Sequence, residues 1–391
     1  MTADLVRRLE QILDDLIRRK DIHSVVLRVA SGNGDLDWAG ARGVQHPHGP
    51  AMTPDTPFFT ASITKLFIAA VVMRLVEEGS LALTDPLPDH LPREVVSGLH
   101  TLDGVDRTGE ITIQHLLAHA SGLPDYIEDF PAASSTGTDR RSLVEILVEE
   151  GDRSWSLRDT AHRIREGLRP HFPPQDLTGE RVRIRYSDTN YQLLMGIVEA
   201  VGSKPFPAVL HELILEPLGL RHTWIPEAGD DAGEGRRAAT VWFKDQIVSF
   251  PRFFASIGDL NSTAGDLIHF LRSLVEGQFF RKAETWPRMQ ARWHRFRHPL
   301  DRAALRQPSW PIEYGLGVMR FQLPRFLTPL RPLPPVIGHT GSTGTWLFHV
   351  PELDVYLVGA ANQITAGPVP FRVVPKLLRS ALDSRTSGPA A

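Results

Sequence analysis

The sequence of 391 residues lacks several features that would point to whole classes of protein. It contains no cysteine, which excludes disulfides, cysteine nucleophiles and thiolate metal sites. Its net charge is only −3, so the charge balance gives no reason to expect nucleic acid or an anionic membrane as a partner. Neither Gly-x-Gly-x-x-Gly nor a Gly-Lys pair occurs, so nucleotide-binding folds are unsupported and no cofactor is predicted.

Two further scarcities concern serine and lysine. The motif Gly-x-Ser-x-Gly is missing, which removes the nucleophile elbow of α/β-hydrolases. Only six of the 43 basic residues are lysines, so this chain normally uses arginine for surface charge. Lys65 is therefore unusual, because it lies between Ile63 and Phe67 at the start of an apolar segment. Ser62 is the only serine with a lysine three residues later.

The N-terminal segment 1–20 predicts an amphipathic helix with its leucines and isoleucines on one side. Charged residues interrupt the segment throughout, which is not typical of a signal peptide or a transmembrane span. If Met1 is the true start, we expect the protein to stay in the cytoplasm. The expected partner is a small molecule rather than nucleic acid or a membrane, and the sequence leaves the oligomeric state open.

Strand-like segments lie near both ends of the chain, and helical patterns fill the middle. The predicted strands are 24–30, 36–40, 314–319, 346–350 and 355–360. The predicted helices are 66–78, 111–119, two within 140–179, 189–201, 206–218, 262–276 and 370–382. This order predicts a single α/β domain of the α+β type, with an antiparallel sheet built from both termini and flanked by helices. One lobe would comprise about residues 1–61 and 235–391, and a mostly helical lobe, about 62–234, would be inserted into it.

The pair Ser62 and Lys65 is suited to nucleophilic catalysis. A helix that follows directly would leave Ser62 at its N-terminus, where free N–H groups and the helix dipole favour developing negative charge. Residues three apart share a helical face, with roughly 5–6 Å between Cβ atoms, so Lys65 can reach the serine hydroxyl. Serine is a weak nucleophile that needs such a neighbour to remove its proton. The alternative is that Ser62 caps the helix and Lys65 is a solvated charge.

Two more polar segments adjoin apolar ones. Residues 186–191, Tyr-Ser-Asp-Thr-Asn-Tyr, precede an apolar helix that Asp188 or Thr189 is expected to cap, which leaves Tyr186 unexplained. Residues 338–344, Gly-His-Thr-Gly-Ser-Thr-Gly, separate two strand-like segments. A hairpin turn accounts for that composition, but its glycines also allow the backbone to approach a ligand closely.

Together these three segments resemble the serine penicillin-recognising family, which comprises class C β-lactamases, D,D-peptidases and related esterases. Its motifs are Ser-x-x-Lys, a Ser-Asp-Asn or Tyr-x-Asn element, and Lys-Thr-Gly or His-Thr-Gly. Here they read Ser62-Ile63-Thr64-Lys65, Tyr186-Ser187-Asp188 and His339-Thr340-Gly341, in the family's order. Three further positions also resemble the family: the segments Leu116–Leu123 and Tyr314–Gly317, and the residue Asn362. The resemblance extends over roughly residues 20–380.

The resemblance implies a role for each matched residue. Ser62 would be the acylated nucleophile. Lys65 and Tyr186 would move its proton to the leaving group, and Tyr186 would later activate water. The backbone N–H groups of Ser62 and Ser342 would form the oxyanion hole, typically the largest electrostatic contribution in acyl transfer. The substrate would be held by Asp188, His339, Thr340, Gly341 and Asn362.

Two positions depart from the family pattern. Asp188 stands where the family has asparagine, and an ionised carboxylate can only accept a hydrogen bond that the amide would donate. His339 replaces lysine and is mostly neutral near pH 7. Both changes weaken the expected contacts to a β-lactam. If Asp188 faces Lys65, its negative charge should raise the lysine pKa.

The resemblance therefore implies a β-lactamase/transpeptidase-like fold and a serine hydrolase that works through an acyl-enzyme. Since no export signal is visible, an esterase or amidase acting on small substrates ranks first. A β-lactamase, a D,D-carboxypeptidase or a D-aminopeptidase is the alternative, and a non-catalytic sensor of acyl ligands is an alternative of another class. His115 and His119 have the i, i+4 spacing of metal ligands but no zincin-type glutamate between them, so no metal is predicted.

Overall fold

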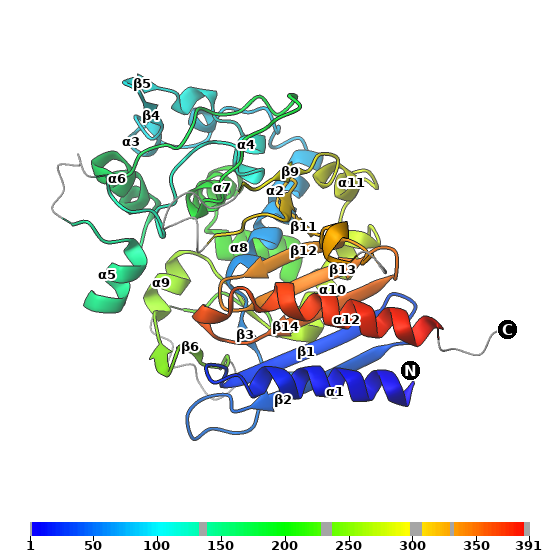
Figure 1. Cartoon of the computed structure of the whole chain (residues 1–391). Coiled ribbons are helices and arrows are strands. Elements are labelled where there is room, and N and C mark those ends of the chain that lie inside the picture. Colours follow the sequence, from blue (N-terminus) through cyan, green and yellow to red (C-terminus); the bar gives the residue numbers. More distant parts are fainter. Residues whose placement is uncertain (1, 133–138, 228–236, 298–306, 329–331, 387–391) are drawn as a thin grey trace.

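The computed structural model describes residues 2–132, 139–227, 237–297, 307–328 and 332–386. These residues form an α/β protein around an antiparallel sheet whose strands come from both ends of the chain (Figure 1). Within them, eight strands make up this sheet, in the order β2-β1-β14-β13-β12-β11-β10-β9. The predicted fold class is thereby confirmed, whereas the lobe boundaries near residues 62 and 234 stay a prediction.

The strands of the sheet are β1 (Ser24–Ser31), β2 (Asp37–Gly43), β9 (His294–Arg295), β10 (Ile312–Tyr314), β11 (Met319–Phe321), β12 (Val336–Gly341), β13 (Thr345–Val350) and β14 (Val355–Ala360). Three short pairs lie outside it: β3 (Phe58–Phe59) with β8 (Asn261–Ser262), β4 (Thr101–Leu102) with β5 (Val105–Asp106), and β6 (Val241–Phe243) with β7 (Gln246–Val248). The helices are α1 (Ala3–Ile17), α2 (Thr64–Glu77), α3 (Arg93–Val96), α4 (Ile113–Leu117), α5 (Leu143–Glu150), α6 (Leu157–Gly167), α7 (Asp188–Gly202), α8 (Phe206–Leu210), α9 (Pro251–Ser256), α10 (Ala264–Val275), α11 (Thr285–Met289) and α12 (Val369–Thr386).

Helices cover both faces of the sheet. The helices α1 and α12 lie side by side on one face, and α10 packs on the other against β1, β13 and β14 (Figure 1). Successive residues of β14 alternate between the two sides, as strand geometry requires. Val355 and Leu357 join the core under α1 and α12, while Tyr356 and Val358 join the larger core around α2 and α10. Because both faces are covered, the central strands β13 and β14 are buried along their whole length.

The helix α2 runs through the larger core and is buried on nearly all sides, as an all-round apolar helix should be. Phe67 stacks on Phe270 of α10 with ring centroids 3.6 Å apart. The helix α7 packs against another part of its surface. This packing fixes the N-terminal end of α2, where Ser62 and Lys65 lie.

The predicted strand at 314–319 is wrong. These residues form the end of β10, a turn and the first residue of β11. Gly317 in the turn has φ +77°, and a Cβ atom on it would lie 2.1 Å from the Cβ of Ala69 in α2. The close packing of this turn on α2 requires glycine and breaks the strand into a hairpin.

The predicted cap of α7 is also wrong. Ser187 occupies the N-cap position, in place of Asp188 or Thr189, and its side chain makes no capping hydrogen bond. The hydroxyls of Ser187 and Thr189 both donate to the Pro124 carbonyl, at 2.9 and 2.6 Å. Asp125 Oδ2 accepts the Asp188 N–H at 3.2 Å. A distant segment therefore caps this helix and holds its first turn in place.

The remaining predicted helices are found close to their expected bounds, with one change of type. The segment predicted as a single helix at 206–218 is α8 followed by a π-helical turn, His211–Leu215. Among the described helices, none is by itself long and apolar enough to cross a membrane. One pair, Asp188–Gly202 and Phe206–Leu215, reaches that length and composition together, with a bend of 77° between its halves.

Candidate active site

Ser62 lies in a short 3₁₀ turn, Ala61–Ile63, that leads directly into α2 at Thr64. The expected place at a helix start is found, although the α-helix itself begins two residues after Ser62. Ala61 has φ +49°, a conformation that costs a residue with a Cβ roughly 1–2 kcal/mol. The surroundings must therefore hold this turn. Ser62 is only half-buried, so its hydroxyl can meet a substrate.

The β12–β13 hairpin braces the turn. Thr345 Oγ1 donates to the carbonyl of Thr60 at 3.0 Å. A Cβ atom on Gly341, at the end of β12, would lie only 2.6 Å from the same carbonyl oxygen. Glycine is therefore needed for β12 to come this close. The approach brings Ser342, the exposed residue after β12, next to the turn that carries Ser62.

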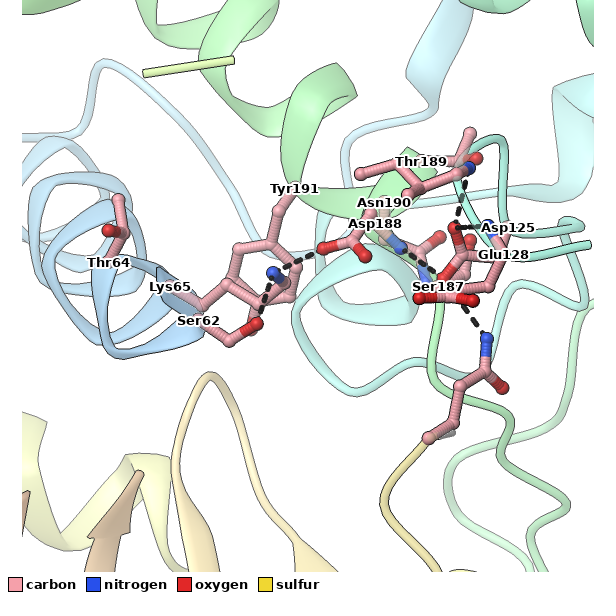
Figure 2. A network of polar contacts seen from close by, with 12 residues as sticks. Ser62, Thr64, Lys65, Asp125, Glu128, Ser187, Asp188, Thr189, Asn190 and Tyr191 are labelled. Atoms are coloured by element: carbon pink, nitrogen blue, oxygen red, sulfur yellow. Dashed lines mark hydrogen bonds and ion pairs between the residues drawn. The ribbon is translucent and has the colours of Figure 1, made fainter. Parts of the chain in front are cut away.

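Lys65 connects Ser62 with Asp188 (Figure 2). Its Nζ donates to Ser62 Oγ at 3.2 Å and forms an ion pair with Asp188 Oδ1. Lys65 is 5% exposed, and burial alone would lower its pKa. The negative charge of Asp188 opposes this, with smaller help from Tyr186 and Asp259, and raises the Lys65 pKa well above its usual value. The predicted contact between Asp188 and Lys65 is thus confirmed, and it keeps the lysine protonated.

Tyr186 lies at the same point. Lys65 Nζ is 5.2 Å from the centroid of its ring, and the residue is 5% exposed. Burial raises the pKa of the phenol, although the neighbouring Lys65 and Ser62 act in the opposite direction. Within the described part of the chain, the Tyr186 hydroxyl has no hydrogen-bond partner. Buried polar groups are normally paired, so this hydroxyl is available to a reacting group.

A cluster of buried aromatic and histidine rings packs against Tyr186. The His119 ring lies 4.4 Å from the Tyr186 ring and 4.7 Å from that of Tyr314, between centroids. His119 Nδ1 accepts hydrogen bonds from the Ser187 N–H at 3.2 Å and from Asn190 Nδ2 at 3.0 Å, which assigns the ring proton to Nε2. Burial lowers the His119 pKa well below its usual value, so the ring is neutral.

His115 and His119 do not form the paired face that their spacing suggested. The helix α4 ends at Leu117, and His119 follows it with φ +55°. His115 Nδ1 accepts from the Thr112 N–H at 3.0 Å, and its Nε2 bonds to the Gln175 carbonyl at 2.6 Å. The two imidazoles therefore have separate structural partners. In the residues that the structure describes, no group of three His, Asp or Glu side chains suited to a metal is found.

His339 and Thr340 are strand residues of β12 rather than part of a turn. His339 is fully buried, with Nε2 bonded to Tyr314 Oη at 2.9 Å and Nδ1 to the Thr340 carbonyl at 2.7 Å. Burial, aided by Lys65, lowers the His339 pKa to about 3. The ring is therefore neutral and both of its nitrogens have partners within the protein, and its role in holding a substrate stays a prediction. The Thr340 hydroxyl meets Met319 Sδ at 3.6 Å.

Asn362 follows β14, the last strand of the sheet in chain order. Its side chain is fully buried, and its Nδ2 donates to Ser24 Oγ of β1 at 3.0 Å. It therefore links the segment that follows β14 to β1, and its role in holding a substrate stays a prediction. The roles of Thr340, Gly341 and the backbone of Ser342 in substrate binding stay predictions.

Two carboxyl groups that the sequence did not single out also face this cluster. Asp125 is buried, and its Oδ2 accepts from the Asp188 N–H and from Gln307 Nε2 at 3.1 Å (Figure 2). Asp259 is half-buried, and burial raises its pKa to about 6, with Asp188 adding to this and Lys65 opposing it. Neither residue belongs to a recognisable motif, so only the folded chain shows that they lie here.

Comparison with known proteins agrees with this geometry. A model of the β-lactamase family matches residues 9–373. Esterase EstB of Burkholderia gladioli is 29% identical over 224 residues, which cover 56% of this chain and 51% of that protein. Penicillin-binding protein 4 of Amycolatopsis lactamdurans is 27% identical over 252 residues, 61% of this chain and 56% of that protein. The matched part thus spans little more than half the length of these relatives.

Among solved structures, the D-amino acid amidase from Ochrobactrum anthropi SV3, complexed with L-phenylalanine amide, has a TM-score of 0.72. It is 22% identical, and the alignment covers 98% of this chain and 100% of the amidase, a likeness that shows the shared fold. Fold and site together place the chain in a family of serine hydrolases. Since the family model extends over nearly the whole sequence, this chain belongs to the β-lactamase family, in its class C-like branch.

Proposed function

We propose that this protein hydrolyses small esters or amides through an acyl-enzyme on Ser62. The observation that carries the proposal is the contact of Lys65 Nζ with Ser62 Oγ at 3.2 Å, beside a Tyr186 hydroxyl without a partner in the described chain. Similarity to one protein named as an esterase and to another named as an amidase supports this class of substrate.

In the proposed acylation, Ser62 Oγ attacks the carbonyl carbon, and its proton passes through Lys65 and Tyr186 to the leaving alcohol or amine. The negative oxygen would lie against the N–H groups of Ser62 and Ser342, which the approach of β12 to the Ser62 turn supports. Water activated by Tyr186 then releases the acid. Because Asp188 keeps Lys65 protonated, the base is available mainly at higher pH, and activity should rise with pH.

Substrates that carry a carboxylate rank second in this proposal. A β-lactam or a D,D-peptide needs a positive group to bind its carboxylate. His339 is neutral and buried, and Lys65 is already paired with Asp188. The charge of the site therefore favours an ester or amide without a carboxylate over the substrates of a β-lactamase or a D,D-carboxypeptidase.

The test compares a short p-nitrophenyl ester with a chromogenic cephalosporin and follows the intact protein by mass spectrometry. We expect a larger kcat/KM for the ester and an acyl adduct that is absent from Ser62→Ala. That variant should lose turnover on the order of 10⁴-fold or more, as removal of a serine nucleophile does elsewhere. A larger kcat/KM for the cephalosporin would reverse the ranking. Wild-type kcat in Ser62→Ala would remove the nucleophile assignment, and an adduct without turnover would favour the acyl-binding sensor.

A further inference from the structure

A cavity lies between the strands β12 and β13 and the helices α10 and α11. Its volume is about 440 Å³, within the range of roughly 300–1,000 Å³ that is usual for ligand pockets. Ile337 and His349 line it from the sheet, and they stand directly opposite each other in the register of β12 and β13. Val275, the last residue of α10, and Trp286 of α11 line it from the helices.

This cavity is separate from the site at Ser62. The other end of the same strand pair, at Gly341 and Thr345, approaches the Ser62 turn. Ile337 lies four residues before Gly341 in β12, which corresponds to roughly 13 Å along the strand. None of the side chains proposed to act in catalysis is among the described residues that line the cavity.

His349 brings an unpartnered polar group to this cavity. The residue is 7% exposed, and its Nε2 has no hydrogen-bond partner in the described chain. Asp354 Oδ1 lies 3.5 Å from this nitrogen, a contact that is an ion pair only when the imidazole is protonated. Burial lowers the His349 pKa, so the imidazole is neutral near pH 7. Since buried polar groups are normally paired, this imidazole can take a partner from a ligand.

Neighbouring side chains fix the imidazole in one orientation. Its ring stacks on that of Tyr356 in β14, with the centroids 4.7 Å apart and 28° between the planes. The guanidinium of Arg272, from α10, lies over the Tyr356 ring at 5.1 Å. Arg272 is itself held, because its Nη2 donates to the Ser31 carbonyl at 2.9 Å. The polar group in the cavity is therefore preformed.

The rest of the lining defines the chemistry of a ligand. Val275, Trp286 and Ile337, together with two prolines, make most of the lining apolar. The remaining polar residue is Gln290, and its Nε2 already donates to the Trp286 carbonyl at 3.1 Å. Among the described residues, no lining side chain is charged near pH 7, so an ion in this cavity would have no counter-charge. The lining therefore suits an uncharged ligand with one polar group.

We propose that this cavity binds an uncharged aromatic alcohol, with its ring against Trp286 and Ile337 and its hydroxyl bonded to His349. A neutral imidazole has one donor and one acceptor nitrogen, and a hydroxyl group can pair with either. The indole favours an aromatic ring, because stacked and edge-to-face ring pairs are stabilised beyond the burial of area. The cavity is thus a second binding site, and it does not depend on acylation of Ser62.

The test measures the dissociation constants of three probes, β-naphthol, naphthalene and β-naphthoate, by isothermal titration calorimetry at pH 7. The probes share one ring system and differ in the polar group. We expect β-naphthol to bind about fivefold more tightly than naphthalene, as for one added hydrogen bond. We expect β-naphthoate to bind at least about tenfold more weakly than β-naphthol, because its charge would be buried without a partner.

Two variants locate the binding. His349→Leu should bring the affinities for β-naphthol and naphthalene to within about twofold of each other. Its control is His162→Leu, at an exposed histidine of α6. Val275→Trp should fill the cavity and remove the binding of β-naphthol. Val148→Trp, at a valine of α5 that is 56% exposed, is the matched control and should leave the affinity unchanged.

Equal affinities of the wild type for β-naphthol and naphthalene would overturn the proposal, as would the absence of β-naphthol binding or an equal affinity for β-naphthoate. Retained binding of β-naphthol in Val275→Trp would place the probe elsewhere, such as at Ser62, and would overturn it too. If His349→Leu does not fold, the three wild-type constants and Val275→Trp decide the matter.

Discussion

Asp129 is a buried carboxyl group and Asp259 a half-buried one, and their surroundings shift their pKa values in opposite directions. Asp129 accepts hydrogen bonds from His171 Nε2 at 2.7 Å, Arg185 Nη2 at 2.8 Å and the Asp125 N–H at 2.8 Å. Burial would raise its pKa, but these donors outweigh burial, and the pKa is lowered. Among the residues that the structure describes, Asp259 has no such set of donors, and burial raises its pKa to about 6. Where the chain supplies the donors, the charged form of a buried carboxyl group is favoured; where it does not, burial favours the protonated form.

The Lys65–Asp188 pair lies between these two cases. It is a complete ion pair, as at Asp129, yet its carboxylate side chain is 21% exposed and its lysine also contacts Ser62. A pair of this kind can be stable and still respond to a substrate. The following predictions test whether the three carboxyl groups differ as this comparison requires.

The largest expected effect is on stability, from Asp129→Ala. This change removes the ion pair between Asp129 and Arg185, and breaking a buried pair typically costs about 3–5 kcal/mol. The lowered pKa of Asp129 means that its stabilisation is present above the usual carboxyl value and is lost as the pH falls through the folded value. Urea unfolding at pH 7 and pH 3 should therefore show a smaller gap between wild type and variant at pH 3. Wild-type stability at pH 7 would contradict a structural role.

Tyr186→Phe should lower kcat on an ester by about a hundredfold or more, as expected for a general acid–base group. The hydroxyl has no partner in the described chain, so the melting temperature should change little. Tyr191→Phe is the control, because its hydroxyl bonds to the Leu117 carbonyl and to Tyr314 Oη. Tyr191→Phe should cost about 1 kcal/mol of stability, and it should lower kcat less than Tyr186→Phe does. An unchanged kcat in Tyr186→Phe would show that Tyr186 is a packing residue and not a proton carrier.

Asp188→Asn should move the acidic limb of the kcat/KM profile to lower pH. The carboxylate raises the Lys65 pKa, so its removal lowers that pKa and makes the neutral lysine available sooner as the pH rises. The profiles of both proteins on one ester decide the point. A limb that stays in place, or moves to higher pH, would refute the coupling between Asp188 and Lys65.

The smallest effect is expected for Asp259→Asn on stability, and its sign is opposite to that at Asp129. The folded pKa of Asp259 lies above its usual value, so its contribution to stability is present at low pH and is lost as the pH rises through about 6. The variant should therefore be more stable than wild type at pH 8 and should lose this advantage at pH 4. Chemical denaturation at the two pH values measures the difference, and destabilisation at pH 8 would show that Asp259 has a structural partner.

Much of the site was predictable because its signals are local. Ser62 and Lys65 are three residues apart, in a 3₁₀ turn and the α-helix that continues it, so their contact follows from helical spacing. The strands at the two ends and the apolar helix between them follow from hydrophobic periodicity. The family resemblance suggested that Asp188 faces Lys65, and their opposite charges then predicted the pairing.

The sequence by itself thus determined the family, the fold and the pair at the start of α2, because these depend on neighbours along the chain and on periodic patterns. Only the tertiary structure decided that His339 and Asn362 turn inward, that Asp125 caps α7, and that Asp259 faces Lys65. The physical reason is the length of chain between the partners. Leu260 bonds to Thr64 across 196 residues, and no local preference specifies a hydrogen bond or a charge environment over such a separation.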